Sequence, residues 1–355
     1  MNNLFFIIFM VFVVVMLTLD LTVFHKKDHV VSVKEAALQT AMWVALAMGF
    51  AVLLYFHAEW VHGRSVEDFA SLAELNSYRH ETAEQFLAGY FLEESLSIDN
   101  IFVMIMIFVS FGVRREYYHR VLFWGIFGAI VLRFIFIFAL GALVTKFSWL
   151  LAVFGVILVY SGIKMFRPQS DEQIDTANHP VVRFASKHFP VTKESHGHDF
   201  FVRQQVVKTS RHQDGLKSRS LEVSKSRLLL TPLFIVLLVI EFSDIIFAVD
   251  SIPAVFSVTT DPVIVYTSNI FAIMGLRSLF FLLSDIADRF WLLHFGLGAL
   301  LCFIGVKMIG GEFFHWHIDT LVSLAVILGI LVVSVLLSII IKKPAHETLD
   351  IRNQQ

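Results

Sequence analysis

Apolar runs of about twenty residues recur along this chain of 355 residues, and they constrain its fold more than any other feature. An α-helix rises 1.5 Å per residue, so about twenty residues cross the roughly 30 Å hydrocarbon core of a bilayer. Hydrophobic residues make up 57% of the sequence and charged residues 16%, an excess that a soluble core of this size does not need. The sequence therefore predicts an all-α polytopic membrane protein whose first partner is the lipid bilayer.

Nine runs can be traced, and each is expected to form one transmembrane helix. The first is not read as a signal peptide, because Met1-Asn2-Asn3 carries no positive charge and no small-residue cleavage site follows. Residues 57–85 are polar and acidic, so they are expected outside the hydrocarbon. Residues 167–227 contain eleven Lys and Arg, and are expected to form a long aqueous loop. The nine runs are residues 4–24, 36–56, 85–111, 121–144, 147–166, 228–249 with a continuation to 253, 263–283, 290–309 and 320–341.

The basic residues are distributed unevenly among the segments that connect these runs. If the N-terminus lies outside, the cytoplasmic segments hold twenty-one of the 28 Lys and Arg, the outside segments hold three, and four lie within the spans. Positive residues favour the cytoplasmic side of a membrane. The sequence therefore predicts an outside N-terminus and a cytoplasmic C-terminus.

The four bases within the spans reveal an internal repeat. Gly-Ala-Ile-Val-Leu-Arg ends at Arg133, and Ala-Ile-Met-Gly-Leu-Arg ends at Arg277, 144 residues later. Gly-Ile-Lys-Met, with Lys164, is followed 143 residues later by Gly-Val-Lys-Met, with Lys307. Each copy has three spans, an odd number, so the copies must be inverted in the membrane. Inverted repeats place ion sites near the midplane, where they meet. The expected units are residues 1–84 with two helices and an outside loop, 85–166 and 228–310 as the repeats, 167–227 as the basic loop, and 311–355 as the last helix and tail.

Each repeat begins with a span that carries acidic residues. Glu241, Asp244 and Asp250 lie in an otherwise apolar stretch, and the first repeat has Glu93 and Asp99 in the corresponding span. A carboxylate near the middle of the membrane costs roughly 2.5–3.5 kcal/mol on insertion scales, so such groups are usually paired or line an ion path. A binding site is therefore the default hypothesis.

Helical spacing brings several of these polar groups onto common faces. Glu93 and Asn100 are seven residues apart and share one face, and Asp244 and Ser251 share the equivalent face of the other span. Glu241 lies one turn before Asp244. We expect Asp244 to face Glu93 near the middle of the membrane, with Asn100 and Ser251 on the same two faces.

Two carboxylates do not fit this arrangement on ideal helices. Asp99 and Asp250 lie about 120° from their partners, so they need either a helix break or a neighbouring helix to reach the same ion. Pro253 is expected to supply a break, because proline has no amide donor and frees the carbonyl of Val249.

The oxygen donors favour a particular class of ion. Carboxylate, amide, hydroxyl and carbonyl oxygens suit Mg²⁺, Ca²⁺ or Mn²⁺ better than Cu⁺ or Zn²⁺. A divalent cation is thus the expected substrate, with no resident cofactor. Because a transported ion must leave again, protons could replace it on the carboxylates, which would make a cation/proton antiporter.

Structural pairing is the alternative reading of these charges. Arg133 and Arg277 could neutralise the acidic helices as buried pairs with no role in transport. Asp20, near the end of the first span, could reach the membrane interface rather than an ion path. Asn269 is expected to form a hydrogen bond that packs two helices together.

The two acidic motifs, Glu-Glu-Ser-Leu-Ser-Ile-Asp-Asn from Glu93 and Glu-Phe-Ser-Asp-Ile-Ile-Phe-Ala-Val-Asp-Ser-Ile-Pro-Ala from Glu241, resemble the paired signature of the TerC family, Alx-like branch. Thr-Ser-Asn-Ile-Phe-Ala-Ile-Met-Gly-Leu-Arg, from Thr267 to Arg277, is similar to that family's next helix. The resemblance implies a bacterial inner-membrane protein of seven to nine helices, linked to Mn²⁺ export and by name to tellurite resistance. It also implies metal-site positions at Asp20, Glu93, Asp99, Asn100, Glu241, Asp244, Asp250 and Ser251.

The sequence thus favours a Mn²⁺ exporter that works by alternating access between two inverted repeats. Exchange of Ca²⁺ or another cation for protons at the same site is one alternative. A membrane assembly or interaction protein that works through residues 167–227 is another. An enzyme is not expected, because neither His-Glu-x-x-His nor Gly-x-Ser-x-Gly occurs. The net charge of −2 gives no reason to expect a nucleic acid partner.

Overall fold

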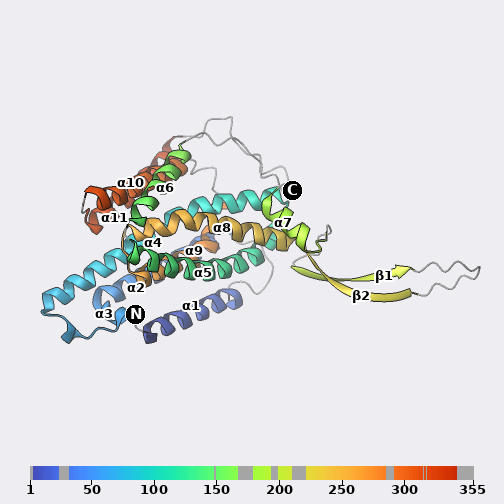
Figure 1. The fold of residues 1–355 in the computed structure, drawn as a ribbon, viewed down its shortest axis with the longest axis horizontal. Helices are drawn as coiled ribbons and strands as arrows, with labels where there is room; N and C mark the ends of the chain where they lie inside the picture. The colour runs from blue at the N-terminus through green and yellow to red at the C-terminus, as the bar shows by residue number, and fades with distance from the viewer. Residues whose placement is uncertain are drawn as a thin grey trace, which may run out of the picture.

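Helices dominate the computed structural model of the chain (Figure 1). The structure describes residues 3–23, 32–147, 149–166, 179–192, 199–209, 221–284, 292–314, 316 and 318–341, without the side chains of 20–23, 204–209 and 221–227. The helices are α1 (Asn3–Val23), α2 (Val33–His57), α3 (Glu59–His62), α4 (Leu72–Ser110), α5 (Arg115–Lys146), α6 (Leu150–Met165), α7 (Pro180–His188), α8 (Pro232–Phe256), α9 (Pro262–Ser284), α10 (Leu293–Phe314) and α11 (Thr320–Ile340), with a short 3₁₀ turn at Val66–Asp68.

The helices agree with the expected class of membrane protein. Among the described residues, six helices are long and apolar enough to cross a bilayer: α2, α5, α8, α9, α10 and α11. Two shorter apolar helices lie at Asn3–Leu19 and Leu150–Met165. The acidic motif lies within α4, which is 39 residues long and begins well before the apolar run predicted at residue 85.

The segment 167–227 contains more structure than the aqueous loop that was predicted. It includes α7 and the antiparallel hairpin of β1 (Phe201–Thr209) and β2 (Leu221–Leu230). The hairpin extends away from the helices (Figure 1). Apolar periodicity could not reveal it, because neither strand is itself an apolar run of spanning length. The predicted start of the span at residue 228 is wrong, since 228–230 belong to β2 and α8 begins at Pro232.

One helix forms the centre of the bundle. The most apolar part of α9 is entirely buried, and the helix packs against α2, α4 and α5. A helix that is apolar all round buries best when other helices surround it. α8 in turn packs against α4 and α5, so four helices with intramembrane polar residues meet: α4, α5, α8 and α9.

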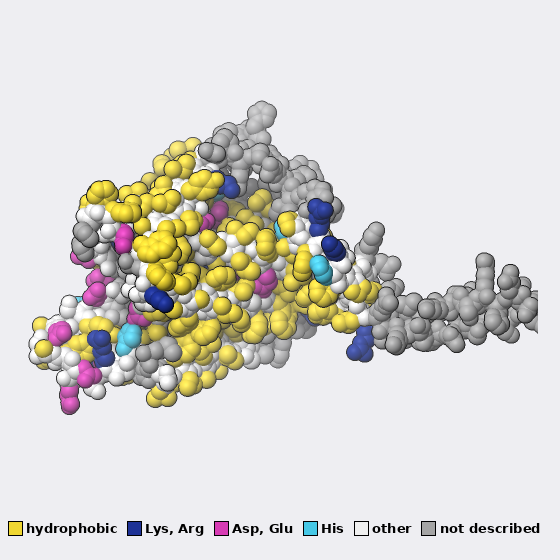
Figure 2. All heavy atoms as spheres, viewed as in Figure 1, with side chains coloured by type: hydrophobic (Ala, Val, Ile, Leu, Met, Phe, Trp, Pro, Cys, Tyr) yellow, Lys and Arg dark blue, Asp and Glu magenta, His cyan; other side chains and the backbone are white. Residues whose placement is uncertain are grey.

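The outer surface of the helices is largely apolar, as contact with lipid requires. Figure 2 shows hydrophobic side chains over the middle of the visible face, with most acidic side chains toward the end near α3, whereas basic side chains lie at both ends. Exposed Ile, Leu and Val on α1 and α11 belong to this apolar surface. In a bilayer these side chains would contact lipid rather than water.

A glycine-based crossing joins α6 to α10. A Cβ atom on Gly155 would lie 2.8 Å from the carbonyl oxygen of Gly305, and one on Gly162 would lie 2.6 Å from that of Gly298. Helix backbones approach this closely only where small residues replace bulky ones. The pair α6 and α10, with α11 against α10, forms a group beside the central bundle (Figure 1).

Replacing Gly305 with Ala is expected to destabilise the protein by about 1–3 kcal/mol, because the added methyl would meet backbone atoms that cannot rotate away. Its Cβ would lie 2.5 Å from the carbonyl oxygen of Gly155 and 2.9 Å from the amide nitrogen of Val159. Thermal unfolding in detergent measures the effect. Gly49→Ala is the matched control, since nothing lies within 4 Å of its added Cβ. Equal melting temperatures for the two variants would contradict the close crossing.

A polar cluster ties α3 to α4 and to the turn before α9. The Arg79 Nε donates to Glu59 Oε2 at 2.8 Å, and His62 Nε2 lies 2.8 Å from Asp261 Oδ2. The hydrogen bond from Arg79 is the main reason that the pKa of Glu59 lies below its ordinary value. Burial would raise the pKa of Asp261, but hydrogen bonding to His62 and to the Val263 amide outweighs burial and lowers it.

Acid is expected to weaken this cluster. A carboxyl whose pKa is lower in the folded state stabilises the fold fully above its unfolded pKa, about 4.3 for Glu, and this contribution is lost as pH falls through the folded pKa. The difference in melting temperature between the wild type and Glu59→Gln should therefore be largest near neutral pH and shrink below about pH 4. Glu67→Gln, at an exposed position, should show no such pH dependence. A difference that stays constant from pH 7 to pH 3 would refute this account.

Candidate metal site

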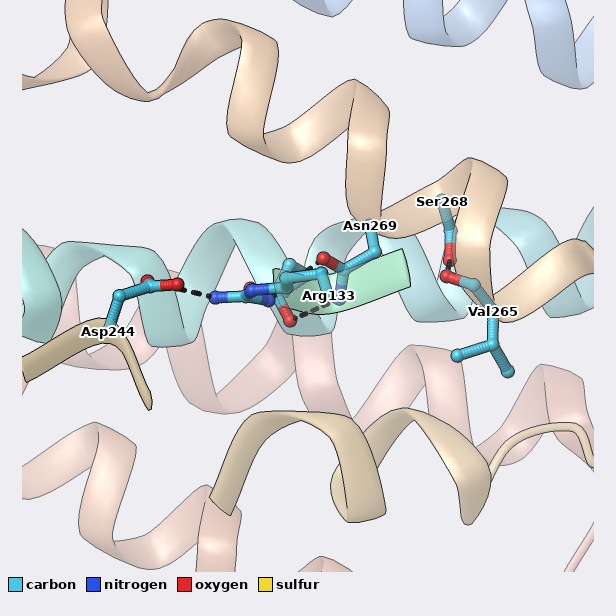
Figure 3. Close-up of polar contacts among 6 residues, drawn as sticks. Arg133, Asp244, Val265, Ser268 and Asn269 are labelled. Atoms are coloured by element: carbon cyan, nitrogen blue, oxygen red, sulfur yellow. Dashed lines mark hydrogen bonds and ion pairs between the residues drawn. The ribbon is translucent and has the colours of Figure 1, made fainter. Parts of the chain in front are cut away.

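Arg133 on α5 lies at the centre of a buried polar group contributed by four helices (Figure 3). Its side chain is 1% exposed and forms an ion pair with Glu93 of α4, which is fully buried. Its Nη2 lies 3.5 Å from Oδ1 of Asp244 on α8, and its Nη1 donates to Oδ1 of Asn269 on α9 at 2.9 Å. A single guanidinium thus links two carboxylates from the two acidic helices. We call Glu93, Arg133, Asp244 and Asn269 the central cluster.

The polar atoms of the central cluster differ in how many hydrogen-bond partners they have. Glu93 receives Arg133 on one oxygen and the Asn269 amide on the other, at 2.9 Å. Among the described residues, Oδ2 of Asp244 and Nε of Arg133 are buried without a hydrogen-bond partner. A buried polar atom without a partner costs about 1–3 kcal/mol, so such atoms in a folded protein need an explanation. The Asp244 Oδ2 is therefore a buried oxygen that no protein donor satisfies.

Glu241 lies next to the central cluster, one turn before Asp244 on α8. Its carboxyl packs against Gly128 of α5, where a Cβ atom would come within 2.4 Å of all three carboxyl atoms. A cavity of about 10 Å³, the size of a single water molecule, is lined by Glu241, Asp244 and Gly125 together with apolar side chains. The Glu241 carboxyl therefore fits against α5 only because residue 128 is a glycine.

Asn100 and Ser251 are buried beside the same two helices, at 3% and 2% exposure. Ser251 interacts with the Glu93 carboxyl, although its hydroxyl has no hydrogen-bond partner of good geometry. Ser97, on the face that carries Glu93, also has a buried hydroxyl without a partner. The expected arrangement places Asp244 and Glu93 face to face, and the two do approach each other, but with Arg133 between them.

Asp99 and Asp250 belong to a separate group, which we call the lateral pairs. Asp99 Oδ1 lies 3.2 Å from Nδ1 of His294 on α10, and Asp250 Oδ1 accepts a hydrogen bond from Ser161 of α6 at 3.1 Å. Both carboxylates thus reach the α6–α10 group rather than the central cluster. The two aspartates still interact electrostatically with each other, and Lys164 also interacts electrostatically with Asp250.

The expected helix break at Pro253 is wrong. α8 continues through Pro253 to Phe256, and the residues after the proline are buried. Of the two routes considered for Asp99 and Asp250, the neighbouring helices supply the contacts. Proline near a helix end removes only one amide donor, and the packing of α8 keeps the last turn helical.

Two further residues of the sequence analysis lie apart from the central cluster. Asp20 belongs to α1, but its side chain is outside the described part of the chain. Arg277 is 2% exposed on α9, and its Nη1 lies 3.3 Å from Nε2 of His119 on α5. The arginines that end the two matching sequence motifs therefore differ in these contacts.

Sequence reasoning missed several members of these groups. His294 and Ser161 are single polar residues in apolar runs, and no spacing connects them to the acidic motifs. The hydrogen bond between helices expected of Asn269 is confirmed, because this residue of α9 bonds Glu93 of α4 and Arg133 of α5. Glu94 has no acidic counterpart in the second acidic motif, where Ile245 follows Asp244, yet its Oε2 is buried without a hydrogen-bond partner and its carboxyl interacts with Glu93.

Within the described residues, no three His, Cys, Asp or Glu side chains lie close enough together to hold a metal ion. In the central cluster, the Arg133 guanidinium forms ion pairs with both Glu93 and Asp244, and Figure 3 shows its contact with Asp244. A cation would have to take the place of this guanidinium to bind both carboxylates.

Comparison with known proteins identifies the chain's relatives. The chain is 42% identical over 331 residues to Alx of Salmonella typhi, named as a candidate membrane-bound redox modulator, with 93% of this chain and 92% of that protein covered. It is 36% identical over 336 residues to a protein of Serratia marcescens named tellurium resistance protein TerC, covering 91% and 90%. No solved structure matches the chain significantly. The model of the family described as "Integral membrane protein TerC family" matches residues 78–346. The chain therefore belongs to the TerC family of integral membrane proteins.

Proposed function

We propose that this protein exports Mn²⁺ across the bacterial inner membrane by alternating access between two inverted three-helix repeats. One observation carries the proposal: two carboxylates from the two acidic helices converge on one arginine in the buried centre of the bundle. Intramembrane ionisable groups that face the bundle interior usually mark an ion or proton path.

The charge of the site supports a cation of more than one charge. Arg133 supplies one positive charge against the two carboxylates of Glu93 and Asp244, which it contacts directly. The pair therefore keeps an excess of one negative charge, and Glu241 and Glu94 are further buried carboxyls beside it that can bind protons. A divalent cation or bound protons would balance this excess, which agrees with exchange of a metal ion for protons.

The donor atoms support a hard or borderline metal ion. Carboxylate oxygens, the amide of Asn100 and the hydroxyl of Ser251 suit Mn²⁺, Mg²⁺ and Ca²⁺ alike. The choice of Mn²⁺ therefore rests on the family resemblance rather than on the ligands. A redox function through a dithiol–disulfide pair would need two cysteines, and this chain has only Cys302.

Contacts between matching helices support the repeat. α4 packs against α8, α5 against α9, and α6 against α10. The α6–α10 crossing is reciprocal, because Gly155 approaches Gly305 while Gly162 approaches Gly298. Since 155 and 298, and also 162 and 305, differ by the repeat offset of 143, exchanging the two repeats exchanges these two contacts. Such reciprocity is what a two-fold axis between inverted repeats produces.

Reconstitution in liposomes tests the function. Purified protein should move Mn²⁺ down its gradient, and an opposing proton gradient should drive it further. Mg²⁺ and Ca²⁺ are offered as competitors. Faster Ca²⁺ than Mn²⁺ flux would favour the calcium exchanger, and absence of flux for all three ions would overturn transport.

The hairpin β1–β2 favours a second candidate, a partner-binding role for the segment 167–227, because it extends clear of the helices (Figure 1). Replacing residues 203–228 with a short Gly-Ser linker separates the two functions. Loss of Mn²⁺ tolerance in cells, with unchanged flux in liposomes, would assign the hairpin to an assembly role.

A further inference from the structure

Arg133 and Arg277 end the matching motifs of the two repeats, but the structure places them differently. Arg133 lies in the central cluster, bound to Glu93 and close to Asp244. Arg277 is equally buried, on α9, and contacts His119. Two equivalent residues in unequal surroundings are what one conformation of an inverted-repeat transporter is expected to contain.

The repeat relationship assigns Arg277 a definite set of partners in the opposite conformation. Arg133 contacts Glu93 of its own repeat and Asp244 of the other. Glu93 and Asp244 are themselves equivalent positions. After exchange of the repeats, Arg277 would therefore contact Asp244 of its own repeat and Glu93 of the other, which is the same pair of carboxylates.

Building on the proposed function, we infer that Arg133 and Arg277 alternate as the counter-ion of the Glu93–Asp244 pair, one in each end state of the transport cycle. The two cannot bind there in the same way at once, because both oxygens of Glu93 are already engaged by Arg133 and Asn269. The metal ion binds between these states, when neither guanidinium lies between the carboxylates.

The required movement is within the range of known helix shifts. Arg277 follows Asn269, which touches Glu93, by eight residues, or about 12 Å along α9. The Arg277 guanidinium contacts His119, which lies 14 residues, or about 21 Å along α5, before Arg133, so the side chain must also turn back toward Asn269. A slide of α9 by about one turn, together with extension of the side chain, would bring the guanidinium to the carboxylates.

The alternation keeps the cluster neutralised in both end states. Leaving two buried carboxylates without a counter-ion is strongly unfavourable. Arg277 is then a positioning residue, which sets the balance between conformations. Two equivalent arginines therefore serve one carboxylate pair.

Spin-label distance measurements test the alternation without any metal ion. In a Cys302→Ser background, labels at Lys146→Cys and Thr260→Cys lie at exposed positions near the end of α5 and the start of α9. Arg133→Lys keeps the charge but loses the fork of donors, so it should raise the population of a second distance by at least about threefold. Adding Arg277→Lys should return the ratio toward that of the wild type.

Each outcome bears on the proposal. A second distance that does not appear in Arg133→Lys, or one that Arg277→Lys leaves unchanged, would overturn the alternation. Arg120→Gln is the control, because its guanidinium lies over the Phe200 ring, 5.1 Å from the centroid, and outside the central cluster. If the distances behave as expected while liposomes show no Mn²⁺ flux, the alternation stands and the proposed substrate is wrong.

Discussion

In an Arg277→Gln background, which removes the second arginine, Arg133→Gln is expected to destabilise the protein by about 3–5 kcal/mol, because it leaves the buried carboxylates of Glu93 and Asp244 without a counter-ion. The loss would be measured as a large fall in melting temperature and in the yield of folded protein in detergent. Arg133 is 1% exposed and Glu93 is fully buried, so water cannot compensate. This makes Arg133 the single side chain on which the central cluster depends most.

A charge-removal series separates electrostatics from packing in this first prediction. If uncompensated charge is the cause, Arg133→Gln combined with Glu93→Gln and Asp244→Asn in the same background should recover at least about half of the lost stability, since neutral groups can be buried at lower cost. The triple variant should still fail to transport. Arg120→Gln again serves as the matched control. The electrostatic account fails if the triple variant is as unstable as Arg133→Gln alone.

Asp244→Asn is expected to impair transport rather than folding. Mn²⁺ transport should fall at least about a hundredfold while the folded protein remains stable. Changes to residues that merely support a metal ligand already cost 10–100-fold, and this change removes the ligand itself. The fold should persist because Arg133 keeps its ion pair with Glu93 and its bond to Asn269. Removing one carboxylate also reduces the negative excess of the cluster.

The measurements for this second prediction are Mn²⁺ flux in liposomes and the melting temperature of the same preparation. Asp319→Asn is the matched control, since Asp319 is exposed and its side chain makes no capping bond to α11. A well-folded Asp244→Asn protein that transports like the wild type would exclude Asp244 from the ion path. The site would then have to be sought at the lateral pairs.

The class of the protein and the approximate positions of its helices followed from hydropathy. Each predicted run corresponds to one helix, although those of α1 and α6 are among the shorter apolar ones, because an apolar segment gains most by forming a helix wherever it is removed from water. The hairpin β1–β2 was not predicted. Its strands have neither the length nor the apolar character that identify a span.

The candidate site was predicted only in part. Helical spacing placed Glu93 and Asn100, and likewise Asp244 and Ser251, on common faces, which agrees with their burial. It did not predict that Asp99 would meet His294, 195 residues away, or that Asp250 would meet Ser161. Periodicity tells which residues share a face, but not which helix packs opposite that face.

The sequence by itself determined that carboxylates lie inside the membrane, because their cost in hydrocarbon requires a partner or a ligand. It also determined that two matching segments carry them. Only the tertiary structure decided which partner each carboxylate has. Arg133 reaches Glu93 across 40 residues and Asp244 across 111. Such contacts depend on how α4, α5, α8 and α9 pack, and helix packing is governed by surface shape over many side chains rather than by any local pattern.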